Sequence, residues 1–411
     1  MPDRRPPSPD ALRDARSLRG ARTSHVRGAV THRAVGRACV LAPLVVGLVA
    51  APLVTLPAEA AAVRPTTTPA PSGTAACDPD GPERLIPATP RALTALGADE
   101  AHRVASGAGV VVAVVDSGVD ARNSHLAGAV VAGADLVGPG DGRDDADGHG
   151  TAVAGIVAAR PVTGSGVVGL ALGATVLPVR VYDRRTGPDG VRTDRIAQGV
   201  RWAVAHGADI VNVSLSSASD DPELRAAVGA AVDAGVLVVA SAGNGDDART
   251  DRYPAAYPGV LGVVATDAAG RPVATGPAVD VAAPGGGVVT TFHAVGDCAL
   301  DGPAQASWAT AYVSATAALL AERFPAEGAD AWARRVVEAA HGSGDVPVLD
   351  PAAAVRSAVA DGTPAGTHAP GGEVLGAATA DPVRPRPVWP WWVLGAAALL
   401  LGLRAARRPA R

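Results

Sequence analysis

From residue 110 onward, apolar runs alternate along the chain with segments whose apolar residues recur at helical spacing. The runs are rich in β-branched residues, which is typical of strands buried on both faces of a parallel sheet. Ile196, Val200 and Val204 predict a helix, with Thr193 as its N-terminal cap. The runs that predict strands are 110–115, 176–181, 210–213 and 236–239.

A second helix is predicted to begin after Asp221, because this carboxylate can cap the first turn and Pro222 suits the first helical position. Alternation of strands and helices indicates an α/β fold, with a parallel sheet flanked by helices and right-handed crossovers. Ligands of such sheets bind beyond the carboxyl ends of the strands. The residues that follow each strand are therefore the candidates for chemistry.

The N-terminal end of the chain has the pattern of an export signal. Residues 1–38 are rich in arginine, 40–56 are mostly apolar, and Ala58-Glu59-Ala60 has the small-x-small form of a cleavage site. We expect 1–62 to be a cleaved signal peptide with a long basic front. Residues 63–106 would then form a leader or N-terminal extension, whose first part is rich in Pro, Thr and Ala.

The C-terminal end predicts a membrane anchor. After a main domain at 107–355, residues 356–387 are a linker rich in Pro, Gly and Ala. Residues 388–403 begin with tryptophans and continue as an apolar run, and the tail 404–411 carries four arginines. This pattern predicts a single transmembrane helix with the tail in the cytoplasm and the main domain outside. A buried core helix is the alternative.

Composition allows one large domain and argues against some partners. With 411 residues, 48% of them hydrophobic, the chain can bury the core of one domain of about 250 residues. A net charge of −4 and the lack of a basic patch with interleaved aromatics give no reason to expect nucleic acid. Cys39 lies in the predicted signal, so Cys77 and Cys298 remain for one disulfide in an exported protein. Two unpaired buried thiols are the alternative.

His149 is the leading candidate for catalysis. It lies between Gly148 and Gly150 at the start of an alanine-rich apolar segment. The glycines permit a tight turn and close approach of a substrate, and histidine is the usual general base near neutral pH. A loop before a helix with an incidental histidine is the other interpretation of this pentapeptide.

No metal or cofactor is expected. Asp144, Asp145 and Asp147 form a small acidic cluster before His149 that suits a cation, but a solvated loop is the favoured interpretation. His125 and His206 fit loop or helix-end positions and are assigned no role.

Three further polar residues stand where an α/β fold places chemistry. Asp116 closes the first strand before a glycine turn, Asn244 follows the strand at 236–239, and Ser307 precedes an apolar alanine-rich helix. Each has a structural alternative: a ligand for metal or ribose, a turn asparagine, and an N-cap serine.

Taken together, the order Asp116, His149, Asn244 and Ser307 resembles that of the subtilisin-like (S8) serine proteases. The resemblance covers roughly residues 107–355. The motifs that carry it are Val114–Gly118, Gly148–Thr151, Ala242–Asn244, Tyr253–Val260 and Ala282–Gly285.

This resemblance implies a serine endopeptidase acting on proteins or peptides. Asp116, His149 and Ser307 would perform acyl transfer, with Asn244 stabilising the oxyanion. The family relation also implies a set of substrate-binding residues. They are Ser214, Leu215, Ser216, Ser241, Ala242 and Gly243.

A narrower resemblance is to the mycosins, the membrane-anchored subtilases associated with type VII secretion in actinobacteria. It rests on residues 148–159, on Tyr312-Val313-Ser314, and on the combination of signal peptide, leader with one cysteine and C-terminal anchor. It implies a protease domain on the outer face of the cytoplasmic membrane, anchored through 388–403, beside a type VII secretion complex.

Two departures from the family pattern leave a second function open. The family has Gly-Thr-Ser and a proline four residues after the serine, whereas this chain has Gln305-Ala306-Ser307 and Ala311. Serines also follow Leu215 where glycines are usual, which should narrow the substrate channel. The alternative to an active protease is therefore a weak or inactive domain that serves as a structural component of a secretion complex. A nucleotide-binding domain is disfavoured, because no glycine-rich phosphate loop follows the first strand.

Overall fold

The computed structural model describes residues 77–183, 191–342 and 344–357. The predicted signal peptide and transmembrane helix lie outside these ranges. Within them, no helix combines the length and the apolar character that a bilayer crossing requires.

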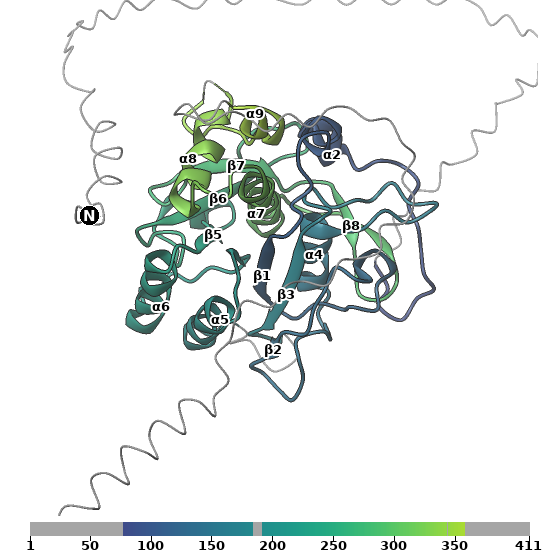
Figure 1. Cartoon of the computed structure of the whole chain (residues 1–411), viewed down its shortest axis with the longest axis horizontal. Helices are drawn as coiled ribbons and strands as arrows, with labels where there is room; N and C mark the ends of the chain where they lie inside the picture. The colour runs from purple at the N-terminus through teal and green to yellow at the C-terminus, as the bar shows by residue number, and fades with distance from the viewer. Residues whose placement is uncertain (1–76, 184–190, 343, 358–411) are drawn as a thin grey trace, which may run out of the picture. The chain divides into compact units, whose positions relative to one another are not determined.

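A seven-stranded parallel sheet forms the centre of the protein (Figure 1), in the order β2-β3-β1-β4-β5-β6-β7. The four apolar runs are confirmed as strands: β1 is Val111–Asp116, β3 is Thr175–Arg180, β4 is Ile210–Val213 and β5 is Leu237–Ser241. Their side chains are almost all buried, as expected of strands covered on both faces. The other members are β2 (Ala134–Asp135), β6 (Val260–Thr266) and β7 (Val281–Pro284).

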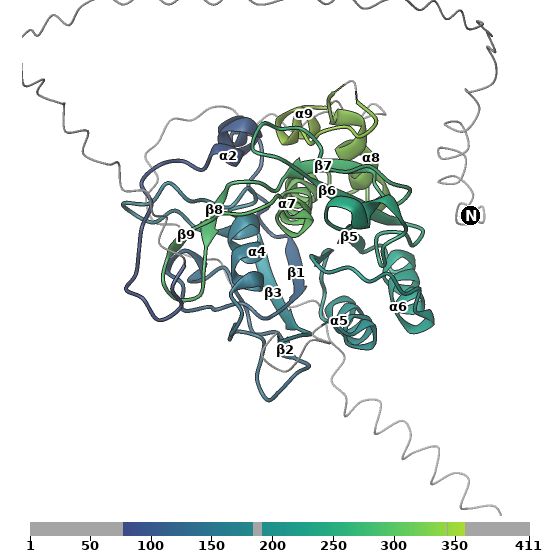
Figure 2. The same ribbon diagram turned by 180° about the vertical axis from the view of Figure 1, so that it is seen from behind.

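Helices cover both faces of the sheet. Helices α4 (His149–Ala158) and α7 (Ala306–Arg323) pack on one face, and α5 (Thr193–Ala205) and α6 (Pro222–Asp233) lie on the other, as Figures 1 and 2 show. Helix α4 is buried on nearly every side, because α7 and β8 (Val288–Thr291) also contact it. This deep packing fixes the start of α4, where His149 lies.

The predicted helix caps are half right. Asp221 caps α6, since its Oδ1 accepts from the N–H groups of Glu223 and Leu224 at 2.8 and 3.0 Å. The prediction that Thr193 caps α5 is wrong, because the cap position is Arg192, whose side chain makes no capping bond. The Thr193 hydroxyl instead donates to Asp221 Oδ2 at 2.8 Å and ties the two helices together.

The described part of the N-terminal extension, residues 77–106, packs against the domain and contains two short helices, α2 (Arg91–Ala95) and α3 (Ala98–His102). The structure pairs Cys77 with Cys298 in a disulfide, with the Cα atoms 5.8 Å apart, as in ordinary disulfides. Cys298 belongs to β9 (Asp297–Leu300), which forms an antiparallel hairpin with β8.

The extension leads into β1 at the amino end of the sheet, where the Ser106 carbonyl accepts a hydrogen bond from the N–H of Gly173, just before β3. Catalytic candidates lie at the opposite, carboxyl ends of the strands. The other elements are η1 (Ser124–Leu126), η3 (Gly245–Arg249), α8 (Ala329–Ala339) and α9 (Pro351–Arg356).

Candidate active site

The fold brings the predicted polar residues to one edge of the sheet. Asp116 ends β1, Ser214 follows β4 and Asn244 follows β5. These strands are neighbours and run parallel, so their carboxyl ends meet at the same edge. Helices α4 and α7 begin at this edge and supply His149 and Ser307.

Asp116 and His149 are directly paired. Asp116 Oδ1 lies 2.7 Å from His149 Nδ1, and the aspartate side chain is fully buried. The same oxygen accepts from the backbone N–H of Ser117 at 2.7 Å. Because an ionised carboxylate only accepts, the pairing places the proton of neutral histidine on Nδ1, so Nε2 is the nitrogen that can accept another.

The glycines beside His149 are required by close packing. Gly148 is the N-cap of α4 with φ 85°, and a Cβ there would lie 2.3 Å from Phe292. A Cβ on Gly150 would lie 2.0 Å from the carbonyl oxygen of Gly118. Larger residues would therefore displace the histidine loop, at Gly148 from Phe292 and at Gly150 from the Gly118 carbonyl that follows β1.

Asp145 organises the loop before His149. Its carboxylate accepts hydrogen bonds from the hydroxyls of Ser117 and Thr151 and from the N–H groups of Asp147, Gly148 and Thr151. Burial raises the pKa of Asp145, although these donors favour its charged form. The prediction of a solvated loop is therefore wrong for Asp145, which is 5% exposed and acts as an internal cap.

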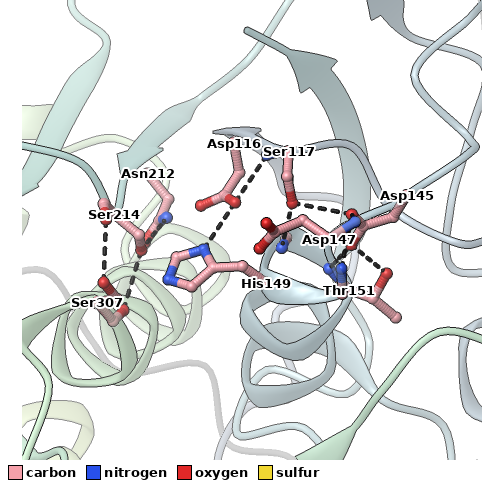
Figure 3. A network of polar contacts seen from close by, with 11 residues as sticks. Asp116, Ser117, Asp145, Asp147, His149, Thr151, Asn212, Ser214 and Ser307 are labelled. Carbon is pink, nitrogen blue, oxygen red and sulfur yellow. Dashed lines mark hydrogen bonds and ion pairs between the residues drawn. The ribbon is translucent and has the colours of Figure 1, made fainter. Parts of the chain in front are cut away.

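Ser307 is the second residue of α7, so it is not the N-cap that the structural alternative required. Its hydroxyl donates to the Ser214 carbonyl at 3.0 Å, and the Ser214 hydroxyl donates to the Ser307 carbonyl at 2.9 Å. Figure 3 shows the His149 ring between Asp116 and Ser307. Trp308 flanks the same ring, with the ring centroids 4.7 Å apart.

Ser307 is supported by buried polar residues that the sequence analysis did not identify. Asn212 Nδ2 donates to Ser214 Oγ, and Ser314 Oγ donates to Asn212 Oδ1, both at 2.9 Å. Asn212 and Ser314 are fully buried. The signal that could have found them is a polar residue inside an apolar strand and an apolar helix, which requires a partner when buried.

Asn244 contacts the residues that precede Ser307. Its Oδ1 accepts from the Ala306 N–H at 2.7 Å, and its Nδ2 donates to Gln305 Oε1 at 2.9 Å. The Asn244 side chain is exposed, as a group that meets a substrate must be. Gln305 has φ −114° and ψ 128°, an extended conformation that does not need the family's glycine.

The six predicted substrate-binding residues lie along the ends of β4 and β5. The side chains of Ser214, Leu215, Ser241 and Ala242 are buried, so these residues can offer a substrate chiefly their backbone. Ser216 is half-buried, and Gly243 has φ 99°, a conformation that favours glycine. Among the residues described, no group of three His, Cys, Asp or Glu side chains is placed to hold a metal ion.

Comparison with known proteins agrees with this geometry. Residues 107–361 match the Subtilase family. Thermitase from Thermoactinomyces vulgaris is 36% identical over 229 residues, which are 55% of this chain and 80% of thermitase.

Solved structures of similar fold include two mycosins. MycP1 from the ESX-1 type VII secretion system superposes with a TM-score of 0.61 at 27% identity, covering 69% of this chain and 90% of MycP1. MycP3 from the type VII (ESX-3) secretion system has a TM-score of 0.59 at 29% identity, covering 67% and 91%. The chain therefore belongs to the subtilase family of subtilisin-like serine endopeptidases, and its structural neighbours include mycosins.

Proposed function

We propose that the chain is a membrane-anchored, extracytoplasmic endopeptidase of the mycosin kind, which hydrolyses peptide bonds in proteins linked to type VII secretion. The observation that carries the catalytic part is the 2.7 Å contact between Asp116 and His149, with Ser307 on the other side of the imidazole (Figure 3).

In the proposed reaction, His149 Nε2 takes the proton from Ser307 Oγ as this oxygen attacks the substrate carbonyl carbon. Asp116 orients the ring and stabilises the imidazolium that forms. The hydroxyl of Ser307 donates to the Ser214 carbonyl at rest, so this hydrogen bond must break and the hydroxyl hydrogen must turn toward His149 before attack. The imidazolium then gives its proton to the leaving amine, and water releases the acyl group by the same steps in reverse.

Two donors are available to the tetrahedral intermediate. The Ser307 N–H lies in the first turn of α7, where backbone N–H groups have no partner within the helix. The Asn244 amide is the second donor, and loss of the corresponding amide in subtilisin lowers kcat by about 10²–10³-fold. The positive end of the α7 dipole also favours negative charge at this point.

Hydrolysis of a generic protein substrate tests the catalytic assignment. The full-length protein should cleave casein. Replacement of Ser307 or His149 by alanine should reduce kcat by about 10⁴-fold or more, and Asp116→Asn should reduce it by about 10⁴-fold. Cleavage by a folded Ser307→Ala variant at the wild-type rate would refute the triad.

The location rests on the predicted signal at 1–62, on the predicted anchor at 388–403, and on the origin of MycP1 and MycP3 in type VII secretion systems. We expect the full chain to remain in the membrane fraction after alkaline carbonate extraction, whereas a chain ending at residue 387 is released. External protease should digest the main domain in intact cells. A full chain found in the cytosolic fraction would contradict this placement.

One observation favours the second candidate, a weak or inactive protease-like domain that serves as a structural component of a membrane secretion complex. Gln305, at the position of the family's glycine, holds the amide that the oxyanion needs. The casein assay separates the two candidates, because a structural component would cleave casein weakly or not at all in the wild type, so Ser307→Ala would change its rate little.

A further inference from the structure

The amide groups of Asn244 and Gln305 are oriented by two backbone groups with fixed roles. The N–H of Ala306 can only donate, so the atom of Asn244 that lies 2.7 Å away is the acceptor Oδ1. The carbonyl of Pro303 can only accept, so the atom of Gln305 that lies 3.3 Å away is the donor Nε2. These contacts leave Asn244 Nδ2 and Gln305 Oε1 facing each other, and they bond at 2.9 Å.

The contact with Ala306 gives Asn244 a productive orientation. With Oδ1 held by the residue next to Ser307, Nδ2 is the side-chain atom available to a substrate oxygen at the start of α7. In the resting protein, however, one N–H of Nδ2 already donates to a neutral carbonyl oxygen of the chain itself, Gln305 Oε1.

This inference rests on the proposed function. We propose that Gln305 acts as a latch on the oxyanion site, meaning a side chain that occupies the Asn244 donor until substrate binds. Its Oε1 competes with the substrate oxygen for Asn244 Nδ2, so Gln305 must swing away before the tetrahedral intermediate is fully stabilised. The amide nitrogen carries a second hydrogen, but an oxyanion that accepted it would lie close to Gln305 Oε1, whose partial negative charge repels it. Gln305 is thus a positioning residue that sets how much of the Asn244 donor the reaction can use.

The latch is able to open. Gln305 is half-buried and Asn244 is exposed, so the glutamine side chain can turn toward solvent without unfolding its surroundings. The extended backbone at Gln305 tolerates any side chain, so its removal leaves the start of α7 unstrained. Opening breaks one neutral hydrogen bond, which corresponds to a reduction of kcat/KM by about two- to tenfold.

Four variants of the full-length chain test the latch: Gln305→Ala, Gln305→Glu, Asn244→Ala and the double variant Asn244→Ala/Gln305→Ala. For each, kcat and KM on a peptide substrate and Ki for a peptide aldehyde are measured, because the aldehyde adduct places an oxygen at the oxyanion site. Gln305→Ala should raise kcat and lower Ki by about two- to tenfold, with little change in KM. Gln305→Glu should lower kcat, since a carboxylate binds the amide more strongly and repels the oxyanion.

Dependence on Asn244 distinguishes a latch from a general effect of the loop. In the Asn244→Ala background, Gln305→Ala should give no gain, because no donor is left to release. Gln198→Ala, which removes an exposed glutamine from α5, is the matched control and should leave all constants unchanged.

The outcomes separate the latch from the proposed function. A loss or no change of kcat in folded Gln305→Ala, or a gain that persists without Asn244, overturns the latch while an inactive Ser307→Ala still supports the protease. Activity in Ser307→Ala would instead overturn the proposed function. If thermal melting shows that Gln305→Ala does not fold, the nearly isosteric Gln305→Glu decides, and wild-type kcat in that variant overturns the latch.

Discussion

His125 Nε2 lies 2.8 Å from Asp297 Oδ1, and neither side chain is exposed. The other ring nitrogen, Nδ1, lies 2.7 Å from the carbonyl oxygen of Arg160. Both ring nitrogens therefore face acceptors, which suits a doubly protonated ring. Asp297 Oδ2 also accepts from the N–H of Ile86 at 2.7 Å, so the pair joins the N-terminal extension to β9.

This pair predicts a specific pH dependence of stability. Burial disfavours the imidazolium of His125, but the Asp297 carboxylate and the Arg160 carbonyl outweigh it and raise the pKa of His125. The stabilisation is then complete below the unfolded pKa of about 6.5 and is lost as the pH rises through the higher pKa of the folded state. Urea titrations between pH 5 and pH 9 should show this fall in the free energy of unfolding.

His125→Ala should remove that pH dependence and lower the free energy of unfolding by about 3–5 kcal/mol at pH 6, because it leaves a buried carboxylate unpaired. His206→Ala, which removes an exposed histidine at the end of α5, is the control and should retain the wild-type profile. An equal slope in wild type and His125→Ala would show that other groups set the pH dependence.

Asp145→Asn tests the internal cap of the histidine loop. An amide nitrogen would face N–H or O–H donors where the carboxylate accepts, so we expect a loss of about 2–4 kcal/mol in the free energy of unfolding. Activity should fall further than stability alone explains, because Gly148 and the adjacent His149 lose their support. Denaturant unfolding and kcat/KM measured well below the melting temperature separate the two effects. Asp144→Asn, on an exposed neighbour, is the control.

Trp308 is expected to hold the imidazole of His149 and to favour its charged form in the transition state. Trp308→Ala should lower kcat/KM by about two- to tenfold, because it removes a ring interaction of roughly 0.5–1.5 kcal/mol. Trp308→Phe keeps an aromatic face and should recover most of this loss. Equal activities of the alanine and phenylalanine variants would show that ring contact has no part in catalysis.

The Cys77–Cys298 disulfide should stabilise the described domain, because it fastens the start of the extension to β9 across 221 residues of sequence. Replacing both cysteines by serine should lower the free energy of unfolding by about 2–5 kcal/mol. Reduction by dithiothreitol should have the same effect on the wild type and none on the double variant. A wild-type melting temperature insensitive to reduction would contradict this role.

The sequence predicted the centre of the fold, because strands buried on both faces must be apolar throughout. The runs that became β1, β3, β4 and β5 could hardly adopt another role in an α/β chain. The short strands β2 and β9 carry no such pattern and depend on tertiary contacts. Thr193 was misassigned as a cap because its hydroxyl bonds to Asp221 on another helix, a contact invisible to local propensity.

The residues of the candidate active site were likewise predicted only in part. Asp116, His149, Asn244 and Ser307 could be named because strand ends and glycine turns mark them and a family pattern orders them. The roles of the supporting residues Asp145, Asn212 and Ser314 were not predicted, because they depend on side-chain bonds that link distant parts of the chain. Local sequence also gave no hint that Gln305 would bond to Asn244.

Covalent labelling of Ser307 tests the central claim most directly. Full-length protein treated with a fluorophosphonate probe and digested should yield one labelled peptide, with the probe on Ser307 Oγ, and labelling should fall strongly in His149→Ala. A label absent from wild-type protein that melts cooperatively, or a label on another serine with Ser307 unmodified, would contradict the account.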